Sequence, residues 1–292
     1  MNRKLLITGA YGQLGREMRN ALSELEGRCD ALYTDVDTLD ITDAKAVDSL
    51  IASNNVGMIV NCAAYTAVDR AEDEPELCRK INVDAVANLA MAARAHGAKV
   101  VHISTDYVFD GTGCRPYTET DATCPQSVYG STKLEGERQL TRILPQDSVI
   151  VRTSWLYSPY GKNFVKTMIA LGQSRPALSV VCDQMGTPTA AADLAAAIVT
   201  LLKAGEWKAG IYHFSNEGAI SWYDFTMAIH RLAGITGCDV SPIRTDQYPT
   251  RARRPSYSVL DKSKIKSELG LRIPYWEESL ARCISILKQQ EN

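Results

Sequence analysis

The sequence has no long apolar run and almost no net charge, and both absences narrow the classes of protein that it can represent. Its 292 residues contain 32 Lys and Arg against 34 Asp and Glu, which gives a formal net charge of −2. This balance provides no general attraction to nucleic acid or to an anionic membrane, so we expect neither as a partner. The best candidate span, residues 194–202, is far too short to cross a bilayer and indicates a buried helix instead.

Cysteine and histidine are present without the spacings that metal sites and disulfide frameworks use. No C-x-x-C pair occurs among the eight cysteines, and the four histidines show no ligand spacing. We therefore predict no metal site, and we interpret the cysteines as small buried hydrophobic residues. No signal-peptide pattern precedes the first strand-like segment at 5–7, so we expect a cytoplasmic protein.

Short apolar runs alternate with longer amphipathic segments in the first half of the chain. The apolar runs lie at 5–7, 58–60, 100–103 and 149–151, and helical segments lie at 13–25, 44–53 and 75–96. Continuous apolar runs of this length are typical of strands buried on both faces of a parallel sheet. The sequence therefore predicts an α/β fold with a Rossmann-like, doubly wound parallel sheet.

Proline and glycine divide the chain into shorter pieces after about residue 155. Helical segments are predicted there at 163–171, 193–203, 222–232 and 276–288. We predict a dinucleotide-binding Rossmann domain at 1–155 and a smaller C-terminal substrate-binding lobe at 156–292. Some segments of this lobe are expected to return to the main sheet.

A glycine-rich turn, GAYGQLG at 9–15, joins the first predicted strand to the first predicted helix. Gly9, Gly12 and Gly15 let the backbone approach a pyrophosphate, and the helix N-terminus offers free N–H groups and a positive dipole. The G-x-x-G-x-x-G spacing resembles the fingerprint of short-chain dehydrogenases. We therefore expect NADPH or NADH as cofactor.

Two charged residues favour different nicotinamide cofactors. Asp35 follows a strand-like segment at 31–34, where a carboxylate binds the adenosine ribose hydroxyls and repels a 2′-phosphate. Arg16, next to Gly15, would instead attract that phosphate. The sequence leans towards NADH and leaves NADPH open.

Tyr129 and Lys133 form a Tyr-x-x-x-Lys pair, which a helix places on one face. A nearby ammonium favours the phenolate and lowers the pKa of a tyrosine from its usual value of about 10. We expect Tyr129 to protonate a carbonyl oxygen as hydride reaches the carbon, and Lys133 to reach the nicotinamide ribose. Thr105, just after the predicted strand 100–103, is expected to donate a hydrogen bond to the same oxygen.

Together these motifs resemble the dTDP-4-dehydrorhamnose reductases, a family of extended short-chain dehydrogenases, over nearly the whole chain. Further matching segments are NCAAYTAVD at 61–69, STDYVF at 104–109, VYG at 128–130, RTSW at 152–155, NF at 163–164, DQMGTPT at 183–189 and ARRP at 252–255. The resemblance implies a nucleotide-sugar substrate, dTDP-4-dehydro-L-rhamnose, whose C4 ketone is reduced with NAD(P)H to give dTDP-L-rhamnose.

The resemblance also implies which residues bind the ligands. The implied cofactor residues are Gly12, Gln13 and Leu14 at the diphosphate, Asp35, Asp40 and Ile41 around the adenosine, and Ala64, Tyr65 and Thr66 along the groove. The implied sugar residues are Thr105, Asp106 and Trp155. Arg253 and Arg254 have the guanidinium geometry that suits the substrate diphosphate. For Trp155, a place in the hydrophobic core remains nearly as good an interpretation.

Some members of the family are thought to form a magnesium-bridged dimer through acidic residues of the fingerprint helix and of the second lobe. Glu17 is present here, but 190–192 are alanines, and only Asp193 lies nearby. We predict no essential metal, and a homodimer stays possible.

Other activities remain as alternatives. A sugar-nucleotide 4,6-dehydratase commonly has Asp-Glu after the threonine, whereas Tyr107 follows Asp106 here, which disfavours it. A 4-epimerase shares the Tyr/Lys pair but keeps NAD tightly bound, and another nucleotide-sugar reductase is also open. A non-catalytic, NAD(P)-binding regulatory subunit has a similar fold, although nothing in Thr105, Tyr129 or Lys133 shows decay.

Overall fold

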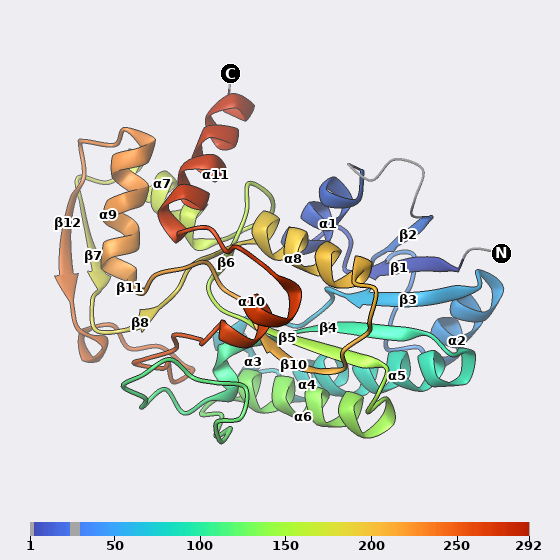
Figure 1. Ribbon diagram of the computed structural model, residues 1–292. Coiled ribbons are helices and arrows are strands. Elements are labelled where there is room, and N and C mark those ends of the chain that lie inside the picture. Colours follow the sequence, from blue (N-terminus) through green and yellow to red (C-terminus); the bar gives the residue numbers. More distant parts are fainter. Residues whose placement is uncertain (1–2, 24–29, 292) are drawn as a thin grey trace.

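The larger lobe of the protein is built on a six-stranded parallel sheet (Figure 1). The computed structural model describes residues 3–23 and 30–291. The strand order is β10-β5-β4-β3-β1-β2, and every neighbouring pair is parallel. The strands are β1 (Lys4–Thr8), β2 (Ala31–Thr34), β3 (Val56–Asn61), β4 (Lys99–Thr105), β5 (Ser148–Thr153) and β10 (Gly210–His213). The predicted strands at 5–7, 58–60, 100–103 and 149–151 are confirmed, and so is the fold class.

Helices cover both faces of this sheet, which explains why its strands are apolar without interruption. On one face lie α1 (Gln13–Ser23) and α8 (Ala191–Lys203), and on the other lie α2 (Ala44–Ser53), α5 (Ala85–His96) and α6 (Val128–Ile143) (Figure 1). Successive side chains of a strand point to opposite faces. Leu5 and Ile7 therefore pack with α1 and α8, and Leu6 packs with α2 and α5.

One of the predicted helices differs from the structure, and the predicted end of another lies outside the described residues. The segment at 75–96 consists of α4 (Pro75–Arg79), a π-helical turn η1 (Lys80–Asp84) and α5. The first helix ends at Ser23 within the described part, and Leu25 lies outside it. A short helix, α3 (Val68–Ala71), follows β3.

The smaller lobe has its own hydrophobic cluster, in which α7 (Phe164–Ser174), α9 (Trp222–Ala233) and α11 (Trp276–Glu291) pack together. Three two-stranded sheets accompany these helices. They are β6 (Leu156–Tyr157) with β9 (Thr189–Ala190), β7 (Ala177–Val181) with β12 (Asp239–Ile243), and β8 (Met185–Gly186) with β11 (Ile220–Ser221). The remaining elements are the 3-10 turns η2 (Asp106–Val108) and η3 (Thr245–Gln247) and the helix α10 (Ser263–Leu269). Although they follow residue 155, β10 and α8 lie with the main sheet, and the division at 155/156 stays a prediction.

The interpretation of the cysteines as buried hydrophobic residues is wrong for Cys114 and Cys124, which are exposed in the loops before α6. Cys78 and Cys283 are buried as predicted, and Cys29 lies outside the described residues. All seven described cysteines are free thiols. Across the described residues, no helix is long and apolar enough to cross a membrane.

Candidate active site

The glycine-rich turn lies where the strand order reverses between β1 and β3. Doubly wound sheets bind their ligands in the crevice at this switch point. Gly9 has a φ of +63°, and a Cβ atom on it would meet the Ala63 nitrogen at 2.7 Å. Only glycine therefore lets the turn pack directly against the segment that follows β3.

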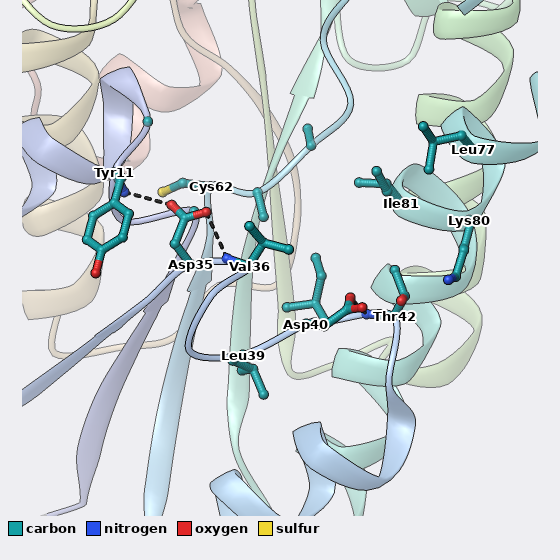
Figure 2. A pocket seen from close by; sticks show the side chains of 15 residues that line it. Tyr11, Asp35, Val36, Leu39, Asp40, Thr42, Cys62, Leu77, Lys80 and Ile81 are labelled. Atoms are coloured by element: carbon teal, nitrogen blue, oxygen red, sulfur yellow. Dashed lines mark hydrogen bonds between the residues drawn. The ribbon is translucent and has the colours of Figure 1, made fainter. Parts of the chain in front are cut away.

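A pocket of about 510 Å³ opens beside this turn (Figure 2). Six of the residues predicted to bind the cofactor line it: Gly9, Gly12, Asp35, Asp40, Ile41 and Ala64. The turn, the loop after β2 and the segment after β3 thus meet around one cavity, as the dinucleotide prediction requires.

Five other predicted cofactor residues, in the segments that continue from Gly12 and Ala64, lie outside the pocket lining. The Gln13 side chain accepts a hydrogen bond from Asn163 at 2.9 Å, and the Leu14 side chain belongs to the core below α1. Gly15 packs against the Gly9 carbonyl. At the other end, the Tyr65 hydroxyl donates to Glu74 at 2.6 Å, and Thr66 is exposed. For Leu14, only the backbone is free to reach a ligand.

Both charged residues with a cofactor preference contact Tyr11 of the glycine-rich turn. The Asp35 carboxylate accepts the Tyr11 backbone N–H at 2.8 Å and the Val36 N–H at 2.9 Å (Figure 2). The Arg16 guanidinium donates to the Tyr11 carbonyl at 3.0 Å. Asp35 therefore stands in the pocket with its carboxylate already held by the backbone.

One wall of the pocket was not predicted. Leu77, Lys80 and Ile81 project from the helical segment opposite Asp35 (Figure 2), and Lys80 contributes to lowering the pKa of Asp40, after hydrogen bonds from Thr42. Lys80 and Ile81 belong to the π-helical turn η1, a conformation that occurs frequently at functional sites. No spacing in the sequence distinguishes this turn from a continuous helix. The family segment NCAAYTAVD, which the sequence matches, ends at residue 69 and does not reach it either.

Thr105 and Tyr129 come together where β4 meets the start of α6. Ser127 caps α6 by accepting the Gly130 N–H, so Tyr129 lies in the first helical turn. A Cβ atom on Gly130 would meet the Tyr107 carbonyl oxygen at 2.3 Å, so glycine here lets α6 pack against η2. The Thr105 side chain lies close enough to the Tyr129 hydroxyl to affect its pKa.

The expected direction of the Tyr129 pKa shift is wrong for this structure. Burial is the largest effect and raises the pKa of Tyr129, whereas Thr105 acts in the opposite direction and Lys133 is not among the largest contributions. The Lys133 ammonium group instead donates to the Ile103 carbonyl at 2.7 Å, and burial lowers its own pKa to about 8. The phenol is thus protonated at neutral pH, which is the state that a proton donor needs.

Asp106 is a buried carboxyl beside the two hydroxyls. Its Oδ1 accepts from the Thr105 hydroxyl at 2.9 Å, and its Oδ2 makes no well-aligned hydrogen bond within the described part of the chain, where the nearby Ser258 side chain acts to lower the Asp106 pKa. Burial raises the pKa of Asp106 to about 6. A buried oxygen without a partner is unfavourable, and a hydroxyl group of a ligand would satisfy it.

Asp106→Asn is expected to stabilise the protein at neutral pH. The folded carboxyl titrates near 6 and the unfolded one near 3.8, so above pH 6 the folded state holds a charge that burial disfavours. The free energy of unfolding should therefore rise by roughly 2 to 3 kcal/mol at pH 7, and this gain should vanish below about pH 3, where both states are neutral. Urea denaturation at both pH values measures it, and an equal gain at the two pH values would contradict the assignment.

The predicted substrate residues occupy two different settings. Trp155 has a left-handed backbone, with φ of 49°, and stacks on Trp222 with ring centroids 3.5 Å apart. Arg254 donates to the Tyr107 hydroxyl at 3.0 Å and forms an ion pair with Asp69 at 2.5 Å. Since the centroids of the Tyr107 and Tyr129 rings are 5.5 Å apart, Arg254 lies near Tyr129.

The Arg253 guanidinium lies elsewhere, on an exposed side chain that donates to Gln126 at 3.3 Å. Trp155 stacks on Trp222 and also packs closely against Gly186, and its strained backbone favours a functional role.

The acidic residues considered for a magnesium-bridged dimer lie on two helices that pack together. Burial raises the pKa of Glu17 on α1, and Asp193 on α8 adds to this. Asp193 accepts hydrogen bonds from Asn216 at 2.7 Å and from Arg282 at 2.8 Å, both within the same chain. The described residues contain no group of three or more His, Cys, Asp or Glu that could hold a metal ion.

Comparison with known proteins gives matches over nearly the whole chain. The family profile described as the RmlD substrate binding domain matches residues 3–289. A dTDP-4-dehydrorhamnose reductase of Aggregatibacter actinomycetemcomitans is 44% identical over 286 residues, which cover 95% of this chain and 97% of that protein.

Two solved structures are similar in fold as well as in sequence. A dTDP-4-dehydrorhamnose reductase of Clostridium acetobutylicum is 45% identical with a TM-score of 0.93, over 98% of this chain and 99% of the other. A dTDP-4-dehydrorhamnose reductase of Bacillus anthracis, solved in complex with NADP, is 40% identical with a TM-score of 0.93, over 98% of this chain and 100% of the other. These matches confirm the resemblance found in the sequence: the chain belongs to the family of the RmlD substrate binding domain, which includes dTDP-4-dehydrorhamnose reductases.

Proposed function

We propose that this protein uses NAD(P)H to reduce the C4 ketone of dTDP-4-dehydro-L-rhamnose, giving dTDP-L-rhamnose. The observation that carries the proposal is that Thr105, Tyr129 and Lys133 are all buried at the carboxyl end of β4, where Lys133 donates to the Ile103 carbonyl, in the sheet whose switch point holds the pocket. The relatives named above support this substrate. When bound, the nicotinamide supplies the hydride to C4.

In this proposal the chain's own groups supply the proton and orient the ketone. Tyr129 gives its hydroxyl proton to O4, and Thr105 donates a hydrogen bond to the same oxygen as charge develops. For this the Thr105 hydroxyl turns away from Asp106, to which it donates in the structure. Asp106 Oδ2 then accepts from a sugar hydroxyl, Trp155 packs against the sugar, and Arg253 and Arg254 bind the substrate diphosphate.

The cofactor fits the pocket in its residue types. The turn at Gly9 and Gly12 would hold the diphosphate at the N-terminus of α1 together with Gln13, Leu14 and Gly15. Asp35, Asp40 and Ile41 would surround the adenosine, and Ala64, Tyr65 and Thr66 would follow the groove towards the nicotinamide. Tyr129 and Lys133 would bind the nicotinamide ribose.

Asp35→Asn is expected to raise the preference for NADPH over NADH, since the carboxylate in the pocket repels a 2′-phosphate and Arg16 is held at the same turn. The ratio of kcat/KM for the two cofactors should shift by about tenfold, which corresponds to about 1.4 kcal/mol. Asp37→Asn, in the same loop but outside the pocket lining, is the matched control. An unchanged ratio in Asp35→Asn would remove Asp35 from cofactor selection.

One assay tests the proposed activity against its alternatives. Purified protein is mixed with dTDP-4-dehydro-L-rhamnose and either NADH or NADPH, absorbance loss is followed, and the product is identified. A 4-epimerase would carry bound NAD and need no added reductant, whereas a regulatory subunit would bind the cofactor without oxidising it. If the protein reduces a different keto-sugar nucleotide faster than dTDP-4-dehydro-L-rhamnose, the proposed reaction type is correct and the proposed substrate is wrong.

The location and assembly of the protein belong to the same proposal. NAD(P)H and a charged nucleotide sugar do not cross membranes freely, which supports the expected cytoplasmic location. Light scattering with and without magnesium tests for a homodimer, and the reductase assay without magnesium tests the prediction that no metal is essential.

A further inference from the structure

A line of buried polar groups runs behind Lys133 through three neighbouring strands. Thr8, Asn61 and His102 lie at or near the carboxyl ends of β1, β3 and β4, and each is at most 1% exposed. The Thr8 hydroxyl donates to Asn61 Oδ1 at 2.6 Å, and Asn61 Nδ2 lies 3.0 Å from His102 Nδ1. His102 Nε2 lies 3.3 Å from Lys133 Nζ.

The backbone fixes the orientation of the Asn61 amide. Asn61 Oδ1 also accepts the Ala63 backbone N–H at 3.2 Å, and a backbone N–H can only donate. A flipped amide would place two donors against each other. Asn61 therefore presents its NH₂ group to His102, and His102 Nδ1 must accept.

This contact decides the tautomer of His102. Burial, and then the Lys133 charge, lowers the pKa of His102 well below its usual value, so the ring is neutral. A neutral imidazole with an accepting Nδ1 carries its proton on Nε2. The Nε2–H consequently faces Lys133 Nζ.

An ammonium group has no lone pair, so a protonated Lys133 meets this N–H donor to donor, whereas the neutral amine accepts it. We propose that Asn61 and His102 are positioning residues, which hold an N–H donor against Lys133 and stabilise its neutral amine. The inference rests on the proposed function, in which Lys133 acts beside Tyr129.

In turnover this arrangement favours the step that restores the phenol. The ketone carbon gains the hydride and its oxygen gains the Tyr129 proton, which leaves a phenolate. The proton that restores the phenol leaves Lys133 Nζ, whose lone pair then accepts the His102 Nε2–H. A proton from solvent finally restores the ammonium.

Other groups around Lys133 act on its charge as well. Glu137 on α6 and Cys78 on α4 raise the pKa of Lys133, against the larger lowering by burial. The Glu137 carboxylate is itself held by Arg152 in a buried ion pair at 2.7 Å. His102 is the neighbour of Lys133 on β4. Its Nε2–H faces Lys133 Nζ and disfavours the protonated form of the amine.

The tautomer is read directly by NMR of protein labelled with ¹⁵N-histidine. The wild-type protein should show His102 with a protonated Nε2, assigned by its loss in His102→Gln. In Asn61→Asp the new carboxylate can only accept hydrogen bonds. His102 should therefore carry its proton on Nδ1, and its Nε2 should accept from the Lys133 ammonium. Thr8→Val is the matched control, because the Ala63 N–H still fixes Asn61, and it should leave the tautomer unchanged.

The charge of Lys133 is read by titrating ¹³Cε-lysine, with its signal assigned in Lys133→Arg. Asn61→Asp should raise the midpoint of the Lys133 titration in both the wild-type and a His102→Leu background. The rise should be about one pH unit larger in the wild-type background, because in His102→Leu only the added negative charge acts. His102→Gln can place its carbonyl towards Asn61 and its NH₂ towards Lys133, so its midpoint should stay near that of wild type.

An Nδ1–H tautomer in the wild-type protein would overturn the inference, and so would equal Asn61→Asp shifts in the two backgrounds. If Asn61→Asp does not fold, the wild-type tautomer and the His102→Gln midpoint decide the question, and a clear shift of that midpoint counts against the inference. All these readouts use the protein without substrate. A failed reductase assay would therefore contradict the proposed function without affecting the interpretation of these NMR results.

Discussion

Tyr129→Phe is expected to lower kcat by about 10²- to 10⁴-fold, the range that a general acid contributes. The substitution removes the proton donor and keeps the ring, which packs with Ala71 and Cys78. Cofactor affinity should stay close to that of wild type, because Lys133 and the pocket beside the glycine-rich turn still hold the cofactor. Loss of NAD(P)H absorbance measures turnover, and quenching of protein fluorescence by NAD(P)H measures binding.

Tyr117→Phe is the matched control for Tyr129→Phe, because it also removes a buried hydroxyl. The Tyr117 hydroxyl donates to Asp110 at 2.8 Å and accepts the Gly113 N–H at 2.8 Å, so its loss affects the loop before α6 rather than the proton donor. Its kcat should stay near the wild-type value. Full activity in Tyr129→Phe would remove this residue from the mechanism.

Glu137→Gln is expected to lower the free energy of unfolding by about 3 to 5 kcal/mol, because it leaves a buried guanidinium without its counter-charge. The Glu137 carboxylate accepts from Arg152 Nε at 2.9 Å and from Arg152 Nη2 at 2.7 Å, and both side chains are 3% exposed. Urea denaturation followed by circular dichroism measures the loss.

The ion pair between Arg115 and Asp121 is the exposed control for Glu137. Its Arg115 side chain is 65% exposed, so Arg115→Met should change the urea midpoint too little to measure. Glu137→Gln combined with Arg152→Leu should recover part of the stability, because it removes the uncompensated charge. A Glu137→Gln protein that unfolds at the wild-type urea concentration would contradict the prediction.

The sheet and the glycine-rich turn were predictable because local patterns determine them. A strand buried on both faces must be apolar throughout, which is why the run at 5–7 marks β1. Gly9 was predictable for a similar reason, since its φ of +63° and its contact with Ala63 exclude any side chain. The placement of Asp35 followed from its distance after the turn.

Other parts of the site depend on contacts between distant segments and left no pattern in the sequence. Lys80 reaches the pocket through a π-helical turn, which has the composition of an ordinary helix. The direction of the Tyr129 pKa shift depends on burial rather than on Lys133, which lies one turn away along the chain. The partner of Lys133 on β4, His102, precedes it by 31 residues and belongs to no motif.

The place of β10 in the sheet also bears on how the chain is synthesised. The strand comes from residues 210–213, yet it covers the outer edge of β5, which ends at Thr153. A nascent chain that stops after β5 would leave that strand with unpaired backbone groups, and bare strand edges promote aggregation. Expression of residues 1–155 alone should therefore give an insoluble fragment. The two lobes consequently fold as one unit, which is complete only after β10 has been synthesised.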